Sequence, residues 1–524
     1  MVHKRSFKIS YTSDIHGYFS NLDYSSGKEL ASGLCNCAGL FARGENTLVI
    51  DGGDTLQGSP FTYYYHKTRR DDEYLPSKVM NAAGYQFVTL GNHDFDYGVP
   101  LIEEYLSQLT ARCLCANVEG IRGVEKTALV TMENGLRIGL TGVTSHYVSR
   151  WEPPENLAGV QISDAFEAAA KAYDELVGVG ADVTVCIYHG GFEKDVATGR
   201  EIFRTDENQG WRICRELGFD VLLTGHQHLR VDSADLFSVH TCQPPDKASG
   251  FLQLEVEVPA QETGEKPKAA SRFIPAGEKR DEAVWAVLSQ AEEQAAQWLD
   301  RPVGHLDVPL RPGDPLAMAL RGTWIANFFN QVQLEASGAD ISVTSLANSV
   351  TGFSQDVSIR DVVSNYVFSN TLKVIEVDRR VLVSALERCA EYFALDQAEN
   401  ISISSAFLLP IPQHYNYDYF SGIEAVFDLQ KPEGQRVVSI RFEGRELDDS
   451  RKLKLSLNSY RASGAGGYPL YAECPVLSEQ NKEITEIIMD YISSHKEIKV
   501  DKTRWLTVLS RRRKETVLHG KKRI

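Results

Sequence analysis

The sequence of 524 residues has no long apolar segment and no sign of a leader peptide. A helix that crosses a bilayer needs about 20 consecutive, mostly apolar residues, and no stretch approaches this length. A secretory signal would begin with a basic region followed by an apolar one, whereas Met1 to Ser10 leads directly into a predicted strand. If the sequence is full length, we therefore expect a cytoplasmic protein with no membrane partner.

Basic residues and cysteines are also scarce. Lys and Arg number 55 against 71 Asp and Glu, and the net charge of −16 argues against a broad basic surface for a nucleic acid polymer. Small anionic substrates stay compatible with this charge, because bound metal ions supply local positive charge. The nine cysteines are an odd number in a long chain, whereas disulfide scaffolds are short and cysteine-dense. The pairs Cys35/Cys37 and Cys113/Cys115 miss the usual zinc spacing, and we interpret the second pair as buried thiols on a strand.

The length exceeds what one hydrophobic core usually organises, so two domains are expected. Up to Val258, short β-branched runs alternate with helical patterns, which is typical of layered α/β architecture; the runs are 7–12, 48–50, 87–90, 137–143, 183–188 and 221–224. The segment from Gln261 to Arg280 has a linker composition, and a helical pattern follows it up to Leu299. We predict a catalytic domain over 1–260, a linker and connecting helix over 261–300, a second domain over 301–510 and a basic tail over 511–524. Within the second domain, helices are predicted over 316–333 and 379–393, and strands over 341–344, 371–377, 425–429 and 437–442.

Five polar clusters each follow an apolar run. They are Asp14-Ile15-His16, Gly52-Gly53-Asp54, Gly91-Asn92-His93-Asp94, His189-Gly190-Gly191 and Gly225-His226-Gln227-His228. In an α/β sheet the carboxyl ends of the strands form the ligand-binding edge, so these clusters can converge on one crevice. Any one of them alone would more often be a capped turn. Their joint occurrence predicts a metal site of Asp, Asn and His ligands, suited to Mn, Zn, Fe or Co.

The order of these motifs resembles that of the calcineurin-like metallophosphoesterases, and the two-domain layout resembles their 5′-nucleotidase and 2′,3′-cyclic-nucleotide 2′-phosphodiesterase branch. The resemblance extends over roughly Phe7 to Leu506. It implies an α/β fold, a four-layer-type sandwich of two mixed sheets flanked by helices, with a C-terminal α+β substrate-specificity domain. It also implies two divalent metal ions. The ligands carried over are Asp14, His16, Asp54 and His228 for one ion, and Asp54, Asn92, His189 and His226 for the other.

The motif around Asn92 also supplies a predicted acid. His93 follows a candidate ligand, so it can face the same crevice without binding metal, and we assign it to the transition-state charge or the leaving oxygen. Asp96 could orient the His93 imidazole and keep it protonated, or it could cap a helix; the resemblance favours the first role. The branch often has glutamine where His228 stands, which leaves the metal preference open.

The second domain carries the predicted substrate contacts. Two aromatic loops could stack a nucleobase at the interface with the catalytic domain, with Tyr417 and Tyr468 as the first pair and Tyr415 and Tyr460 as the alternative. Nearby Asn458 and Arg461 are further candidate substrate-binding residues. Several of these tyrosines could instead be ordinary core residues.

These features predict hydrolysis of nucleotide phosphoesters. The Tyr-Asn-Tyr-Asp and Asn-x-Tyr-Arg-Ala-x-Gly segments look more like the cyclic phosphodiesterase and 3′-nucleotidase members, and Thr344 to Val350 lacks the arginine typical of 5′-nucleotidases. A 5′-nucleotidase or UDP-sugar hydrolase is the enzymatic alternative. A catalytically silent nucleotide-binding protein is the alternative outside enzymes, although such proteins usually lose a ligand or the acid, and here all are present. The sequence leaves the oligomeric state open.

Overall fold

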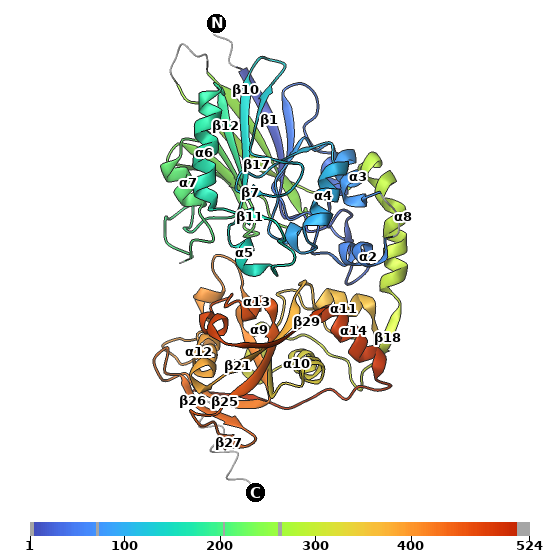
Figure 1. Cartoon of the computed structure of the whole chain (residues 1–524), viewed down its shortest axis with the longest axis vertical. Helices are drawn as coiled ribbons and strands as arrows, with labels where there is room; N and C mark the ends of the chain where they lie inside the picture. Colours follow the sequence, from blue (N-terminus) through green and yellow to red (C-terminus); the bar gives the residue numbers. More distant parts are fainter. Residues whose placement is uncertain (1–4, 70–72, 203–204, 260–264, 511–524) are drawn as a thin grey trace. The chain divides into compact units, whose positions relative to one another are not determined.

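The computed structural model describes residues 5–69, 73–202, 205–259 and 265–510. The chain divides into two compact units, Met1–Gln297 and Trp298–Ile524 (Figure 1). The predicted basic tail, 511–524, lies outside the described residues. Among the helices described, none is long and apolar enough to span a bilayer.

The first unit contains two mixed sheets. One has the strand order β17-β16-β1-β4-β5-β6-β8, and the other has the order β14-β15-β13-β12-β10-β9. The strands of the first sheet are β1 (Arg5–Thr12), β4 (Thr47–Asp51), β5 (Phe87–Val88), β6 (Arg112–Leu114), β8 (Val124–Glu125), β16 (Gly250–Val258) and β17 (Lys268–Pro275). Those of the second sheet are β9 (Thr127–Thr131), β10 (Arg137–Thr144), β12 (Val183–His189), β13 (Val221–Thr224), β14 (Val231–Leu236) and β15 (Val239–Gln243). All six strand runs expected in the first domain are therefore strands.

The core of this unit lies between the two sheets. Ile9 and Ile50 of the first sheet belong to the same buried cluster as Leu140 and Ile187 of the second. Helices α6 (Ala165–Gly178) and α7 (Gly210–Glu216) cover the other face of the second sheet. Figure 1 shows α3 (Leu75–Ala83) and α4 (Val99–Gln108) on the opposite side of β1 from α6. The α/β class, with two mixed sheets flanked by helices, is confirmed.

The linker prediction over 261–280 is wrong for half of its described part, 265–280. Strand β17 pairs antiparallel with β16 along eight residues, from Lys268 opposite Glu257 to Pro275 opposite Gly250. Small residues such as Ala269 and Ala270 gave this segment a linker-like composition, but β17 is an edge strand of the sheet and needs few large apolar side chains. The connecting helix follows as α8 (Glu282–Leu299).

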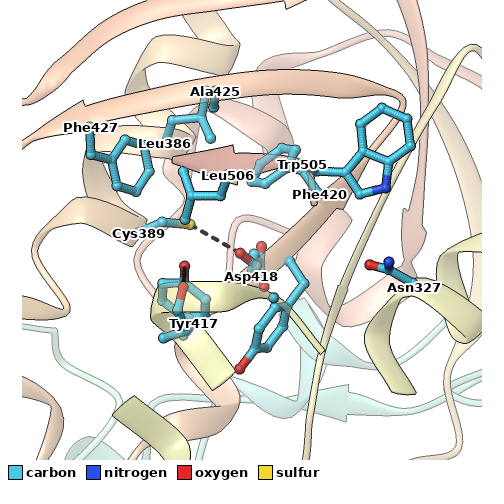
Figure 2. Close-up of a pocket in the computed structure, with 13 residues that line it drawn as sticks. Asn327, Leu386, Cys389, Tyr417, Asp418, Phe420, Ala425, Phe427, Trp505 and Leu506 are labelled. Carbon is cyan, nitrogen blue, oxygen red and sulfur yellow. Dashed lines mark hydrogen bonds between the residues drawn. The ribbon is translucent and has the colours of Figure 1, made fainter. Parts of the chain in front are cut away.

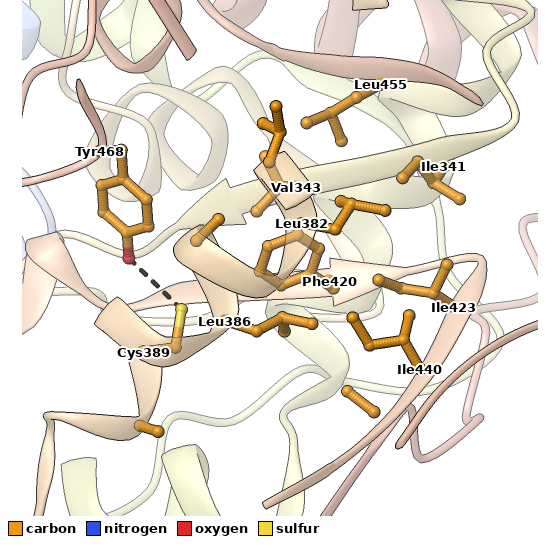
Figure 3. Close-up of a cluster of buried hydrophobic side chains, with 14 of the residues drawn as sticks. Ile341, Val343, Leu382, Leu386, Cys389, Phe420, Ile423, Ile440, Leu455 and Tyr468 are labelled. Carbon is orange, nitrogen blue, oxygen red and sulfur yellow. Dashed lines mark hydrogen bonds between the residues drawn. The ribbon is translucent and has the colours of Figure 1, made fainter. Parts of the chain in front are cut away.

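The second unit is built on a five-stranded and a four-stranded sheet. The five-stranded sheet contains, in order, β24 (Asp418–Ser421), β19 (Ile341–Ser345), β28 (Leu453–Asn458), β21 (Thr371–Val377) and β29 (Val476–Glu483). The four-stranded sheet contains β27 (Arg445–Glu446), β26 (Val437–Phe442), β25 (Ile423–Asp428) and β30 (Leu506–Leu509). Helix α12 (Arg379–Ala390) packs Leu382 and Leu386 against Ile341 of one sheet and Ile440 of the other (Figure 3). A second cluster joins α10 (Trp324–Ser337) to α14 (Ile484–Ser494).

The helix predicted over 316–333 is two helices. α9 (Pro315–Arg321) ends at Gly322, whose φ of 78° breaks the helical path, and α10 begins after Thr323. Thr323 is the N-cap, because its side chain accepts a hydrogen bond from the Ile325 backbone N–H. Apolar residues continue at helical spacing from α9 into α10, so the hydrophobic pattern alone does not indicate the break between the two helices.

Candidate metal centre

The predicted ligands all follow carboxyl ends of parallel strands. Asp14 and His16 follow β1, Asp54 follows β4, and Asn92 follows β5 in the same parallel set. His189 ends β12, while His226 and His228 follow β13, which pairs parallel with β12. Loops from both sheets thus contribute to one site.

Six of these residues form two groups with metal-ligand geometry. Asp14, His16 and His228 make one group and Asp54, His189 and His226 the other, with the ligand atoms in each lying within 4.8 Å of one another. The Oδ2 atom of Asp54 lies 3.3 Å from Nε2 of His189 and 3.8 Å from Nε2 of His16. The Asp54 carboxylate therefore faces both groups, as expected of a bridging ligand.

The side-chain oxygen of Asn92 faces the second group. Asn92 Oδ1 lies 3.2 Å from His189 Nε2 and 2.8 Å from His226 Nδ1. All seven predicted metal ligands are thus brought together.

Each candidate histidine directs its second ring nitrogen to an acceptor outside the two groups. Nδ1 of His16 lies 2.9 Å from the Gln57 carbonyl oxygen, and Nδ1 of His189 lies 2.7 Å from that of Gly52. A carbonyl oxygen only accepts, so both Nδ1 atoms carry a proton and both Nε2 atoms are the ones directed at the centre. Nε2 of His226 lies 2.9 Å from Glu207 Oε1, a hydrogen bond, and Nδ1 of His228 lies 3.6 Å from Asp246 Oδ2, within ion-pair distance.

This arrangement fits bound cations. The Nε2 atoms of His16 and His228 are only 3.0 Å apart. In a neutral His16 ring the one proton is on Nδ1, so His16 Nε2 has no proton to donate to His228. Burial lowers the pKa of His16 to about 4, which favours the neutral ring. Burial also lowers the pKa of His189, but the Asp54 carboxylate raises it to about 9, so the pocket favours positive charge at this nitrogen. A divalent cation would supply that charge and accept the lone pairs.

The backbone at the centre is strained. Five of the candidate ligands have φ between 52° and 70°: Asp14, His16, Asp54, His226 and His228. Non-glycine residues rarely adopt this region, and such strain concentrates at functional sites. Gly58 allows a close approach, because a Cβ added there would lie 2.7 Å from the His16 Cβ. The loops are therefore shaped to direct ligands inward at the cost of backbone strain.

Three supporting carboxylates were not expected from the sequence. Glu207 and Asp246 hold His226 and His228, as described above. Asp94 accepts four backbone N–H groups, those of Asp54, Thr55, Leu56 and Gly91, at 2.8–2.9 Å. Asp94 lies within a recognised motif, but the other two are distant in sequence from the ligands they hold, and no pattern marks them.

His93 and Asp96 form the predicted pair. His93 Nδ1 lies 3.2 Å from Asp96 Oδ2, and the side chains are 32% and 7% exposed, so His93 is the accessible member. Burial lowers the pKa of His93, but the carboxylates of Asp96 and Asp54 outweigh it and raise the pKa to about 10. The alternative for Asp96, a helix N-cap, does not hold, because the N-cap of α4 is Gly98.

The proposed base clamp of Tyr417 and Tyr468 is wrong. These rings are 2% and 3% exposed and belong to the core of the second unit. The Tyr417 hydroxyl donates to the Ala319 carbonyl oxygen, and the Tyr468 hydroxyl donates to that of Asn416. Tyr417 also lines a small pocket of the second unit, beside apolar side chains such as Leu386 and Phe427 (Figure 2). Neither ring has a face left for a nucleobase.

Arg461 and Asn458 also have structural roles. Arg461 is 2% exposed and pairs with the buried Asp418 at 2.9 Å, so its guanidinium does not reach a substrate. The Asn458 side chain caps α13 (Ser459–Ala462) by accepting from the Arg461 backbone N–H. Tyr415 and Tyr460, the alternative pair, are only half-buried. They remain a prediction.

Comparison with known proteins agrees with this geometry. Residues 7–230 match the family model for calcineurin-like phosphoesterases, and residues 302–473 match that for the C-terminal domain of 5′-nucleotidases. The trifunctional nucleotide phosphoesterase YfkN of Bacillus subtilis is 25% identical over 94% of this chain, which spans 38% of that longer protein. The 2′,3′-cyclic-nucleotide 2′-phosphodiesterase/3′-nucleotidase of Haemophilus influenzae is 22% identical, over 94% of this chain and 85% of its own length.

A solved structure shares the whole architecture. The crystal structure of a candidate 5′-nucleotidase from Staphylococcus aureus, in complex with alpha-ketoglutarate, superposes with a TM-score of 0.87 at 28% identity, covering 96% of this chain and all of that one. The two family models and the shared architecture lead to one conclusion. The chain belongs to the calcineurin-like phosphoesterases with a 5′-nucleotidase C-terminal domain and is a hydrolytic enzyme.

Proposed function

We propose that the chain hydrolyses nucleotide phosphoesters at a centre of two divalent metal ions, with 2′,3′-cyclic nucleotides and 3′-nucleotides as preferred substrates. The observation that carries this proposal is the orientation of the candidate histidines at the centre. His16 and His189 each have a protonated nitrogen on a backbone carbonyl and the other nitrogen among ligand atoms. Such an arrangement is typical of metal-binding histidines.

The two groups of ligands would each hold one ion, with Asp54 shared and Asn92 completing the second group. When bound, divalent cations act as Lewis acids on the phosphoryl oxygens and activate the attacking water. Mn, Zn, Fe and Co all suit this ligand set. The backbone N–H of His93 donates to Asp54 Oδ1 at 2.7 Å, which fixes the shared carboxylate.

His93 would act as the general acid. Its Nδ1–H donates to Asp96, and Nε2–H is left to protonate the ribose oxygen as the bond from phosphorus to that oxygen breaks. For a 2′,3′-cyclic nucleotide, the attacking water loses a proton to solvent as its oxygen bonds to phosphorus, the O2′–P bond breaks, and O2′ takes the proton from His93. His93 then regains a proton from solvent. The product is a 3′-nucleotide. A second hydrolysis would release the nucleoside and inorganic phosphate.

The preference for cyclic and 3′ substrates is supported by the Haemophilus relative, which is named for both activities. Two arginines of the second unit form ion pairs within that unit, since Arg360 pairs with Asp300 at 2.7 Å and Arg461 pairs with Asp418 at 2.9 Å. A 5′-nucleotidase is the second candidate, because the Staphylococcus structure of the same architecture is classed with that activity.

A turnover screen tests the proposal. The full chain is depleted of metal, reloaded with Mn²⁺ and assayed on 2′,3′-cyclic AMP, 3′-AMP, 5′-AMP and UDP-glucose. We expect the first two to have the highest kcat/KM. A preference for 5′-AMP or UDP-glucose would replace the substrate assignment, and no turnover of any of the four would contradict the proposed function.

A further inference from the structure

The segment that follows α5 (Val148–Trp151) contacts the loop that carries the acid pair. Asn156 Nδ2 donates to the Asp96 backbone carbonyl oxygen at 2.9 Å and to Glu152 Oε2 at 3.0 Å. The Glu152 carboxyl also forms a side-chain hydrogen bond with Asp96. The Asn156 amide therefore links the Asp96 backbone to the Glu152 carboxyl group, and that carboxyl group in turn contacts the Asp96 side chain.

Two carboxyl groups share a hydrogen bond only when one of them holds a proton. Burial and the neighbouring Asp96 carboxylate raise the pKa of Glu152 well above its ordinary value, so Glu152 is the protonated member. The Asp96 carboxyl group then lies between two donors, because it also accepts from His93 Nδ1 at 3.2 Å.

The last residue of α5, directly before this segment, contacts a candidate metal ligand. The Trp151 ring stacks on that of His226, with centroids 5.5 Å apart and planes inclined by 22°. Trp151 and Glu152 are consecutive residues, so one turn of chain contacts a candidate ligand through the first and the acid pair through the second. The segment can therefore fix the acid relative to the centre.

We propose that Glu152 is a positioning residue for phosphoester hydrolysis: its carboxyl group, held by Asn156, donates to Asp96 and fixes the carboxylate that orients His93. Glu152 acts through Asp96 and touches no reacting atom. This inference rests on the proposed function, in which His93 protonates the leaving oxygen.

Variants at Glu152 test this role, with Glu155 as the matched control. Glu155 lies three residues further along the same segment and is exposed. Metal content, melting temperature, kcat and KM are measured for the full chain with Mn²⁺ and for the variants Glu152→Ala, Glu152→Gln and Glu155→Ala. The substrates are 2′,3′-cyclic AMP and p-nitrophenyl phosphate, whose p-nitrophenolate leaves without an acid.

We expect Glu152→Ala to lower kcat for cyclic AMP by about tenfold or more while KM changes by less than about twofold, because an interaction made in the transition state is weakened. The loss should be smaller for p-nitrophenyl phosphate. Glu152→Gln should recover most of the kcat, because its amide donates to Asp96 as the protonated carboxyl does. Glu155→Ala should match the wild type in every measurement.

Two results would overturn the role of Glu152: equal kcat for Glu152→Ala and Glu155→Ala, or a Glu152→Gln variant as slow as Glu152→Ala. If Glu152→Ala does not fold, Glu152→Met, which keeps the side-chain length without a donor, replaces it in the same comparison. A wild-type chain that turns over neither substrate would contradict the proposed function instead, so the two failures are distinguishable.

Discussion

The candidate ligands are oriented by residues that are not ligands themselves. Backbone carbonyls hold His16 and His189, and carboxylates hold His226 and His228. The ligand types could be predicted because metal chemistry favours Asp, Asn and His at strand ends, and the assignment of individual ligands came from the resemblance of the motif order to the calcineurin-like metallophosphoesterases. The supporting groups could not, since a backbone carbonyl has no sequence signature, and Glu207 and Asp246 resemble any surface acid.

The acid role of His93 gives a prediction at the scale of one side chain. His93→Ala should keep its full metal content and lower kcat for 2′,3′-cyclic AMP by about 10²-fold or more, because a general acid is lost while all ligands stay in place. Metal analysis and steady-state kinetics on the same sample measure both. Loss of a metal ion in His93→Ala would show that His93 is a ligand instead.

Asp94 is predicted to stabilise the loop of the shared ligand. Its carboxylate is the acceptor of four backbone N–H groups, and each donor left buried without a partner costs about 1–3 kcal/mol. Asp94→Ala should therefore lower the free energy of unfolding by more than about 3 kcal/mol, measured by urea denaturation. A change below 1 kcal/mol, on the order of the effect of a surface substitution, would mean that water replaces the carboxylate.

Tyr415 and Tyr460 are now the proposed base contacts. Replacing either with alanine should raise KM for nucleotides by about tenfold or more, since a stacked base is worth roughly 1–3 kcal/mol. KM for p-nitrophenyl phosphate should hardly change, because that substrate has no base. Tyr468→Phe, which keeps a core ring, is the control. Unchanged nucleotide kinetics in both alanine variants would refute base stacking by this pair.

At the scale of elements, strong local patterns were predictive. The apolar runs of β1, β12 and β21 coincide with strands, and the helical spacing of residues 283–299 coincides with α8. The predictions of individual elements were wrong where contacts between distant parts of the chain determine the secondary structure. Strand β17 is defined by pairing with β16, and the break between α9 and α10 depends on Gly322 and Thr323 within a continuous apolar pattern.

The same reasoning explains the failed tyrosine assignment. The sequence places Tyr415 and Tyr417 on one short segment, but only the packing against α12 decides which ring is buried. Tyr417 contacts Tyr392 at a centroid distance of 4.8 Å, within the core cluster. The sequence of such a short segment does not show which tyrosine is buried in the core and which could contact a substrate.

Helix α8 carries a buried acid that makes stability depend on pH. Glu292 is 5% exposed and accepts from the Tyr24 hydroxyl at 2.7 Å, and burial raises its pKa to about 7. Because this folded-state pKa lies above the unfolded value of about 4.3, the folded chain binds more protons between these values. The free energy of unfolding should therefore fall as pH rises through this range, by about 4 kcal/mol at most, and level off above pH 7.

Glu292→Gln should remove this dependence. Urea denaturation at pH 5.5 and pH 8 should show a smaller loss of stability for Glu292→Gln than for the wild type, whereas the exposed neighbour Glu293 gives a control, Glu293→Gln, that behaves like the wild type. Equal losses in all three proteins would mean that Glu292 does not titrate in this range.

At the scale of the whole molecule, the net charge of −16 contrasts with a substrate that is itself an anion. Like charges repel, so the surface as a whole does not attract a nucleotide, and the positive charge must be local. The two ligand groups are where the described residues can concentrate that charge. Metal binding is therefore the central claim, and turnover should depend on it entirely.

The most direct test is a metal titration of the full chain. The protein is made metal-free with a chelator, and Mn²⁺ is added back in steps while bound metal and hydrolysis of 2′,3′-cyclic AMP are measured together. We predict no hydrolysis without metal, binding of two ions per chain, and turnover that rises as the sites fill. Full turnover in a sample shown to be metal-free would contradict the account.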